Sequence, residues 1–299
     1  MLSPKPWKLE AIARLVLSVF ICICAGSLLA GTCYYGGPES KRAQFYVLAA
    51  AAFGLMGLTL GLLQRTWEMN QAIKKIAWTL ATFYAGLLLA VYAETLAGPA
   101  ILVPRVGQMI IGMLSVQGAG LVLIGAFLVQ QHMTWSGAFG FCNNWKHAVL
   151  WGLIVAGIFL PMGILMQKAA DVALRHLPGL HLKPEEQVPV QTLRLASSWV
   201  DRALLGLVTI VLAPVAEETF FRGIIYPTIK QAGFPRLALW ITSLGFAAVH
   251  KNLMVFVPLL ALAILLTLLY EKFDNLLAPI TAHALFNAAN FTMLYFQGG

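Results

Sequence analysis

Long apolar runs separated by short polar breaks cover most of the chain. We distinguish nine runs, and most come close to the ~20 apolar residues that a helix needs to cross a bilayer. The run Leu237–His250 is the shortest of them. We therefore predict an all-α fold, a polytopic transmembrane helical bundle of eight or nine helices. The runs are Ala11–Tyr34, Phe45–Leu63, Ile76–Leu96, Met109–Val129, Val149–Met166, Trp199–Tyr226, Leu237–His250, Leu253–Tyr270 and Leu276–Phe296.

The overall composition supports this prediction. The chain has 299 residues, of which 60% are hydrophobic and 11% are charged, and its mean hydropathy is +0.79. Soluble proteins carry about 25% charged residues, so the surplus apolar surface is expected to face lipid. The net charge of +8 comes from single basic residues near the ends of the runs, such as Arg65, Lys146 and Arg236. This pattern indicates anchoring at a bilayer and no nucleic-acid partner. We expect a multi-pass protein of the cell membrane.

The polar residues divide the chain into three parts. Residues 1–168 are predicted to form N-terminal transmembrane helices with almost no ionisable group at membrane depth. Residues 169–198 are the one extended polar stretch, and its spaced leucines predict a short interfacial helix followed by a loop around Pro184–Pro189. Residues 199–297 form the last part, in which apolar runs carry ionisable side chains.

Three short segments hold these unusual residues. The first contains Glu217, Glu218 and Arg222, the second is Phe246-Ala-Ala-Val-His250, and the third is His283-Ala-Leu-Phe-Asn287. An ionisable side chain at membrane depth costs at least ~2.5 kcal/mol on insertion scales, so such residues usually serve a function. Each histidine by itself would more often be a polar residue that holds helices together. The combination of all three segments favours a functional site.

The spacing within each segment predicts which side chains share a helix face. Glu218 and Arg222 are four residues apart, so they lie on one face and can pair as ions. Glu217 points about 100° away around the helix, which leaves it free to face a cavity. Phe246 lies one turn before His250, and its ring can pack under the imidazole. His283 and Asn287 are also one turn apart, so they share a helix face.

These groups suit the hydrolysis of a peptide bond, which requires an activated water and donors for the developing oxyanion. Glu217 is the natural general base, and His250 would orient the water or pass a proton to the leaving amine. His283 and Asn287 would donate hydrogen bonds to the oxyanion. We expect no cofactor. The alternative is zinc held by Glu217, His250 and His283, although the sequence contains no HExxH helix.

Other chemistries and other functions fit less well. Ser243 is a lone hydroxyl, and no cysteine follows Cys142, which disfavours a serine or cysteine nucleophile. A non-catalytic scaffold or a self-immunity protein that captures a partner in the same cavity is the main alternative function. A transporter would also explain buried Glu and His residues, but we find no inverted repeat.

The three segments, in this order and spacing, resemble the motifs of the CPBP family, which comprises CAAX proteases and bacteriocin-processing or immunity (Abi) proteins. The resemblance covers residues from about 200 to 295. It implies an intramembrane endopeptidase core whose substrate is a peptide or a membrane protein. By position it assigns Glu217 as the water-activating base, His250 as its partner, and His283 with Asn287 as the oxyanion-stabilising pair. Glu218, Arg222 and Phe246 would have supporting roles.

Overall fold

The computed structural model describes residues 2–7, 11–16, 18–19, 110, 112–176, 188–196 and 198–297. The predicted runs Phe45–Leu63 and Ile76–Leu96, and most of Ala11–Tyr34, lie outside these residues. The chain divides into two compact units, one made of residues 1–9 with 134–299 and the other of residues 10–133. Within the second unit, α5 (Ala119–Gln130) follows a π-helical turn, η2 (Leu114–Gly118).

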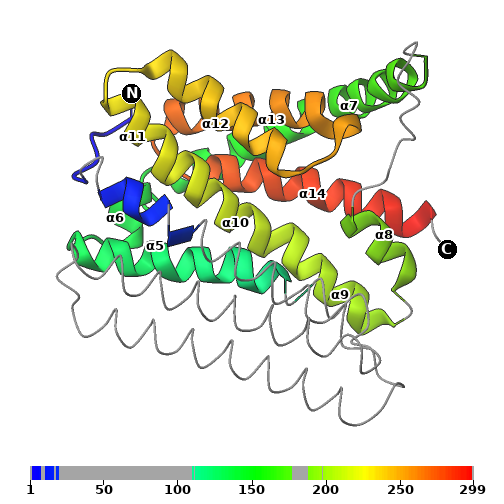
Figure 1. Ribbon diagram of the computed structural model, residues 1–299, viewed down its shortest axis with the longest axis horizontal. Helices are drawn as coiled ribbons and strands as arrows, with labels where there is room; N and C mark the ends of the chain where they lie inside the picture. Colours follow the sequence, from blue (N-terminus) through cyan, green and yellow to red (C-terminus); the bar gives the residue numbers. More distant parts are fainter. Residues whose placement is uncertain are drawn as a thin grey trace, which may run out of the picture. The chain divides into compact units, whose positions relative to one another are not determined.

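The first unit carries all three sequence segments and is built from helices, as Figure 1 shows for the parts drawn as ribbons. The predicted division at residues 168 and 198 remains a prediction. The elements are α6 (Trp135–Phe139), α7 (Trp145–His176), α8 (Val188–Leu195), α9 (Trp199–Leu207), η3 (Val208–Leu212), α10 (Ala213–Glu218), η4 (Thr219–Ile225), α11 (Tyr226–Gln231), α12 (Pro235–Val249), α13 (Leu253–Phe273) and α14 (Leu277–Gln297).

The described helices confirm the predicted all-helical membrane bundle. Three of them, Trp145–Leu174, Trp199–Gln231 and Leu253–Phe273, are long and apolar enough to cross a membrane. Helix α12 corresponds to the shortest predicted run. It has 15 residues and is too short to count among the membrane-spanning helices. Helix α14 has 21 residues but is less apolar, because His283, two asparagines and a glutamine interrupt its apolar sequence.

The ends of the helices around the site follow from individual polar residues. The Asn252 side chain accepts a hydrogen bond from the backbone N–H of Met254 (3.0 Å) and thereby caps the start of α13. Asp274 adopts the left-handed conformation (φ 45°) that ends α13. The Asn275 side chain then accepts from the N–H of Leu277 (2.8 Å) at the start of α14. The turn between α13 and α14 therefore consists of Asp274, Asn275 and Leu276.

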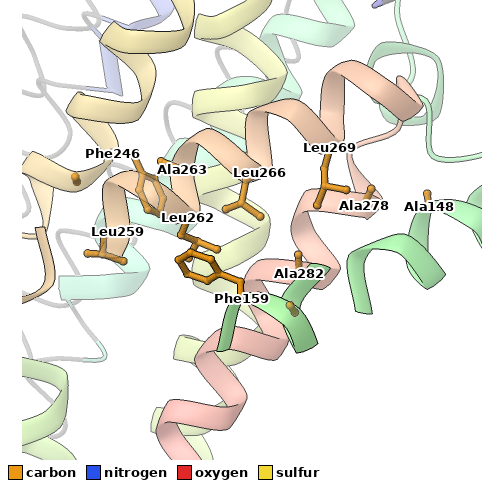
Figure 2. Close-up of a cluster of buried hydrophobic side chains, with 12 residues drawn as sticks. Ala148, Phe159, Phe246, Leu259, Leu262, Ala263, Leu266, Leu269, Ala278 and Ala282 are labelled. Carbon is orange, nitrogen blue, oxygen red and sulfur yellow. The ribbon is translucent and has the colours of Figure 1, made fainter. Parts of the chain in front are cut away.

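A buried apolar cluster joins α7, α13 and α14. It includes Phe159 of α7, Leu262 and Leu266 of α13, and Ala282 of α14 (Figure 2). The close approach of α7 to α14 depends on Gly152, because a Cβ at this position would lie 2.6 Å from the Ala278 carbonyl oxygen. Helix α13 thus lies in the core of the unit, and the α12 ring of Phe246 belongs to the same cluster.

The polar stretch of residues 169–198 differs from the sequence expectation in the position of its short helix. Residues 169–176 continue α7 as a regular helix, and the short helix of this region is α8. The expected loop around Pro184–Pro189 does not include Pro189. This residue lies in the first turn of α8, where a missing N–H removes no intrahelical hydrogen bond. Residues 177–187 lie outside the described part of the chain.

The N-terminal segment Leu2–Trp7 contacts the α13–α14 turn. The Lys5 ammonium donates to the Ala138 carbonyl (2.7 Å) and lies 3.8 Å from an Asp274 carboxylate oxygen. The Ser3 hydroxyl and its backbone N–H both donate to the other Asp274 oxygen. The Lys5 side chain is buried, with 5% of its surface exposed. Burial lowers the pKa of Lys5 below its ordinary value of 10.5, while Asp274 partly opposes this shift.

We expect this lowered pKa to make the protein more stable as the pH rises toward 10.5. The unfolded chain holds the Lys5 proton more tightly than the folded chain, so the free energy of unfolding increases with pH between the two pKa values, by about 1.4 kcal/mol per unit of pKa difference. Thermal unfolding of wild type and Lys5→Met in detergent at increasing alkaline pH would measure it. The difference in Tm should grow in favour of wild type, and a difference that stays constant with pH would contradict the prediction.

Candidate active site

The first sequence segment lies in one long helix that contains two π-helical turns. Residues Trp199–Gln231 run without a break through α9, η3, α10, η4 and α11, visible as the long yellow-green helix in Figure 1. Each π turn comes just before a proline, Pro214 or Pro227. Proline has no N–H to donate and its ring displaces the carbonyl four residues earlier, so the widened turn relieves that clash. Turns of this kind are frequent at functional sites.

Glu218 and Arg222 form the predicted ion pair. One Arg222 Nη donates to Glu218 Oε1 at 2.7 Å, and both side chains have 0% of their surface exposed. A buried charge is tolerated only when it is paired and hydrogen-bonded. The arginine therefore permits a carboxylate to remain charged inside the unit.

Helix α13 holds the other side of the guanidinium. The second Arg222 Nη donates to the Ala263 carbonyl at 3.1 Å, and Nε donates to the Thr267 hydroxyl at 3.5 Å. The Thr267 hydroxyl itself donates to the Ala263 carbonyl at 2.9 Å. The face of the guanidinium packs on the Phe246 ring, 4.5 Å from the ring centroid. Arg222 thus connects three helices through one planar group.

His283 lies between two carboxylates. Its Nδ1 is 2.9 Å from Glu218 Oε1, and its Nε2 is 4.0 Å from Glu217 Oε2. Only 3% of the His283 side chain is exposed, against 23% for Glu217. Because a carboxylate accepts hydrogen bonds, Nδ1 carries a proton and the ring orientation is fixed. Glu217 is therefore the carboxylate that is accessible, and Glu218 is the one that is enclosed.

The ring of Phe246 connects His250 to His283. Its Nδ1 lies 2.7 Å from the Phe246 carbonyl, so this nitrogen is the donor and Nε2 is unprotonated in the neutral ring. The Phe246 ring packs against both histidines, with centroid distances of 5.0 Å to His250 and 5.5 Å to His283. Phe246 is fully buried, whereas His250 is half-buried. The predicted packing of Phe246 under His250 is present, and the same ring also positions His283.

Asn287 contacts the π turn η3. Its side-chain N–H₂ donates to the Thr209 carbonyl at 2.9 Å. The second N–H of this amide is a further donor on the same helix face as His283, one turn away. Asn287 is half-buried. The last helix is thus joined to the long helix at two places, by His283 with Glu218 and by Asn287 with Thr209.

The zinc alternative has no support from the arrangement of the described side chains. Among these residues, no three His, Cys, Asp or Glu side chains are grouped as they would be to hold a metal ion. Glu217, His250 and His283 in particular do not form such a set. We therefore derive no chemical step through a metal.

The chain matches a known protein family over this region. Residues 199–289 match the family described as type II CAAX prenyl endopeptidase Rce1-like, which agrees with the predicted CAAX protease group. All seven of the residues that we proposed from the sequence fall inside the Rce1-like segment, and so do both π turns.

One curated relative matches part of the chain. It is "Uncharacterized protein YpbD" of Bacillus subtilis (strain 168), with 34% identity over 91 residues, which is 29% of this chain and 44% of that protein. The chain thus matches less than half the length of this relative. No solved structure matches the chain.

Sequence reasoning missed the contacts made by residues that lie outside the three sequence segments. Thr267 and the Ala263 carbonyl on α13 belong to none of the three segments, and the Thr209 carbonyl does not either. Thr267 does leave a signal, because it is a hydroxyl in an otherwise apolar membrane helix. Thr209 also leaves one, since a proline lies five residues after it. The Glu218–His283 contact leaves no signal in spacing, because it joins residues 65 positions apart.

Proposed function

We propose that this protein is an intramembrane endopeptidase that hydrolyses a peptide bond near the membrane surface, with Glu217 as the base that activates water. The observation that carries the proposal is the position of Glu217 Oε2, 4.0 Å from the Nε2 of a buried histidine whose other nitrogen is held by Glu218. An accessible carboxylate beside a fixed imidazole is suited to share one water. The Rce1-like match of residues 199–289 supports endopeptidase activity in general.

The reaction begins with a water that contacts Glu217. The 4.0 Å separation between Glu217 Oε2 and His283 Nε2 is too long for a direct hydrogen bond, so a small polar group can contact both atoms. Glu217 takes one proton from the water, and the oxygen of the resulting hydroxide forms a bond to the carbonyl carbon of the substrate. The carbonyl π electrons move to its oxygen, which becomes the oxyanion.

The oxyanion requires donors, which we assign to His283 Nε2–H and the second N–H of Asn287. His283 can donate from Nε2 only as an imidazolium, because its Nδ1 already carries a proton toward Glu218. In that form the charges of Glu217, Glu218, Arg222 and His283 sum to zero. Glu218 would thus hold the imidazolium in place, and Arg222 would hold Glu218.

His250 is assigned to the attacking water. Its Nε2 is the acceptor in the neutral ring, so it can accept a hydrogen bond from the second O–H of the water. This contact would orient a lone pair of the water toward the substrate. When the tetrahedral intermediate collapses, the C–N bond breaks, and the amine nitrogen takes the proton that Glu217 received. The products are a carboxylic acid and an amine, and the base returns to its initial state.

The substrate class follows from the setting. A site on helices that are long and apolar enough to span a bilayer meets peptides that are themselves at the membrane, so we propose a peptide or the tail of a membrane protein, in the cell membrane. The matched family is described as type II CAAX prenyl endopeptidase Rce1-like. A prenyl group on the substrate of this chain is a question for the experiment below.

Comparison of membrane proteomes tests the proposal directly. Cells that carry wild type or Glu217→Gln are compared, with Asp201→Asn, on the same long helix, as the matched carboxylate control. We expect at least one precursor to accumulate in Glu217→Gln alone, and its mature end and any lipid would identify the substrate. Normal function of Glu217→Gln in a deletion strain, with no precursor, would instead support the non-catalytic scaffold or self-immunity alternative.

A further inference from the structure

The π turn η3 leaves one backbone carbonyl without a helical partner. In η3, the N–H of Ala213 donates to the carbonyl of Val208, five residues earlier, instead of to Thr209. The next donor in this π pattern would be residue 214, which would serve Thr209, but Pro214 has no N–H. The Thr209 carbonyl therefore receives neither the α-helical nor the π-helical hydrogen bond of its own helix.

Asn287 is the group that contacts this carbonyl, at 2.9 Å. Within a membrane helix an unsatisfied carbonyl costs several kcal/mol, because neither water nor lipid chains replace its donor. The carbonyl thus strongly favours one position of the Asn287 side chain. One N–H of the amide is held by Thr209, and the second is directed by the planar geometry of the amide group.

We propose that Pro214 is a positioning residue, which acts by withholding a backbone N–H so that the Thr209 carbonyl holds the Asn287 amide in place for catalysis. This inference rests on the proposed function, since it gives a cause for the orientation of one oxyanion donor. It also explains why a proline is retained inside a long helix, where it costs roughly 3 kcal/mol relative to alanine.

The test uses Pro214→Ala, for which thermal stability should stay the same or rise while the catalytic rate falls. Alanine restores the N–H, so the helix can bond the Thr209 carbonyl itself and Asn287 loses its acceptor. We expect an unchanged or higher Tm together with a kcat lower by about tenfold, a part of the ~10²–10³ that loss of an oxyanion donor costs, and little change in KM. The coupling between Pro214 and Asn287, measured below, separates this role from that of a proline that only shapes the helix.

Pro161→Ala is the matched control, because Pro161 lies inside α7 and outside the site. It should raise or preserve the Tm without the fall in kcat. An equal fall in kcat for Pro161→Ala, or unchanged kcat in Pro214→Ala, would overturn the inference.

A second measurement needs no proteolytic activity. Asn287→Ala should lower the Tm in wild type, because it leaves the Thr209 carbonyl unsatisfied. In the Pro214→Ala background the loss should fall to less than half, because the restored N–H supplies the donor. Equal losses in the two backgrounds would refute the role of Pro214 even if the chain is no protease. If instead the Tm values are coupled while Glu217→Gln keeps full activity, the proposed function fails and the Pro214–Thr209–Asn287 linkage stands.

Discussion

Glu217→Gln is expected to lower kcat for a true substrate by about 10²–10⁴, the usual contribution of a general base, while the protein inserts and folds as wild type does. Glutamine has nearly the same shape but cannot accept a proton from water at neutral pH. The side chain is 23% exposed, so the substitution leaves no buried charge without a partner. Single-turnover cleavage of a substrate found in the membrane proteome would measure the loss.

Two controls separate this effect from other causes. Asp201→Asn removes a carboxylate from the same long helix and should keep wild-type kcat. Elemental analysis and chelation address the metal alternative, since stoichiometric zinc whose removal stops cleavage would replace direct glutamate chemistry. Cleavage by Glu217→Gln at the wild-type rate would exclude Glu217 as the base.

The sequence was sufficient to predict contacts within each helix. The Glu218–Arg222 pair and the packing of Phe246 on His250 both join residues four positions apart, and both are present. Helical geometry alone fixes such neighbours. The apolar runs likewise predicted where the described helices lie, because burial in lipid requires about 20 apolar residues whatever the tertiary fold.

Contacts between helices could not be predicted in the same way. Glu218 was expected only to pair with Arg222, yet its carboxylate also holds Nδ1 of His283, which changes the charge that His283 can carry. Thr267 and Thr209 enter the site through a hydroxyl and a carbonyl that any helix could present. Such contacts depend on the rotation and depth of each helix, which neither composition nor spacing encodes.

Arg222→Met is expected to be the most destabilising of these substitutions, at about 3–5 kcal/mol, the usual cost of removing one partner from a buried ion pair. Glu218 would stay enclosed with 0% exposure and lose its cation, and the Ala263 carbonyl would lose a donor. Denaturation in detergent would measure the loss. Lys230→Met is the control, because the Lys230–Glu271 pair is 27% and 24% exposed and surface pairs contribute about 1 kcal/mol or less.

The double variant Glu218→Gln with Arg222→Met separates stability from catalysis. Removing both charges leaves no unpaired ion inside the unit, so much of the lost free energy of unfolding should return. Cleavage should not return, because His283 Nδ1 would then face an amide in place of a carboxylate and the imidazolium would lose the charge that holds it. A double variant that regains both stability and cleavage would show that Glu218 and Arg222 only support the helix, and that His283 acts without them.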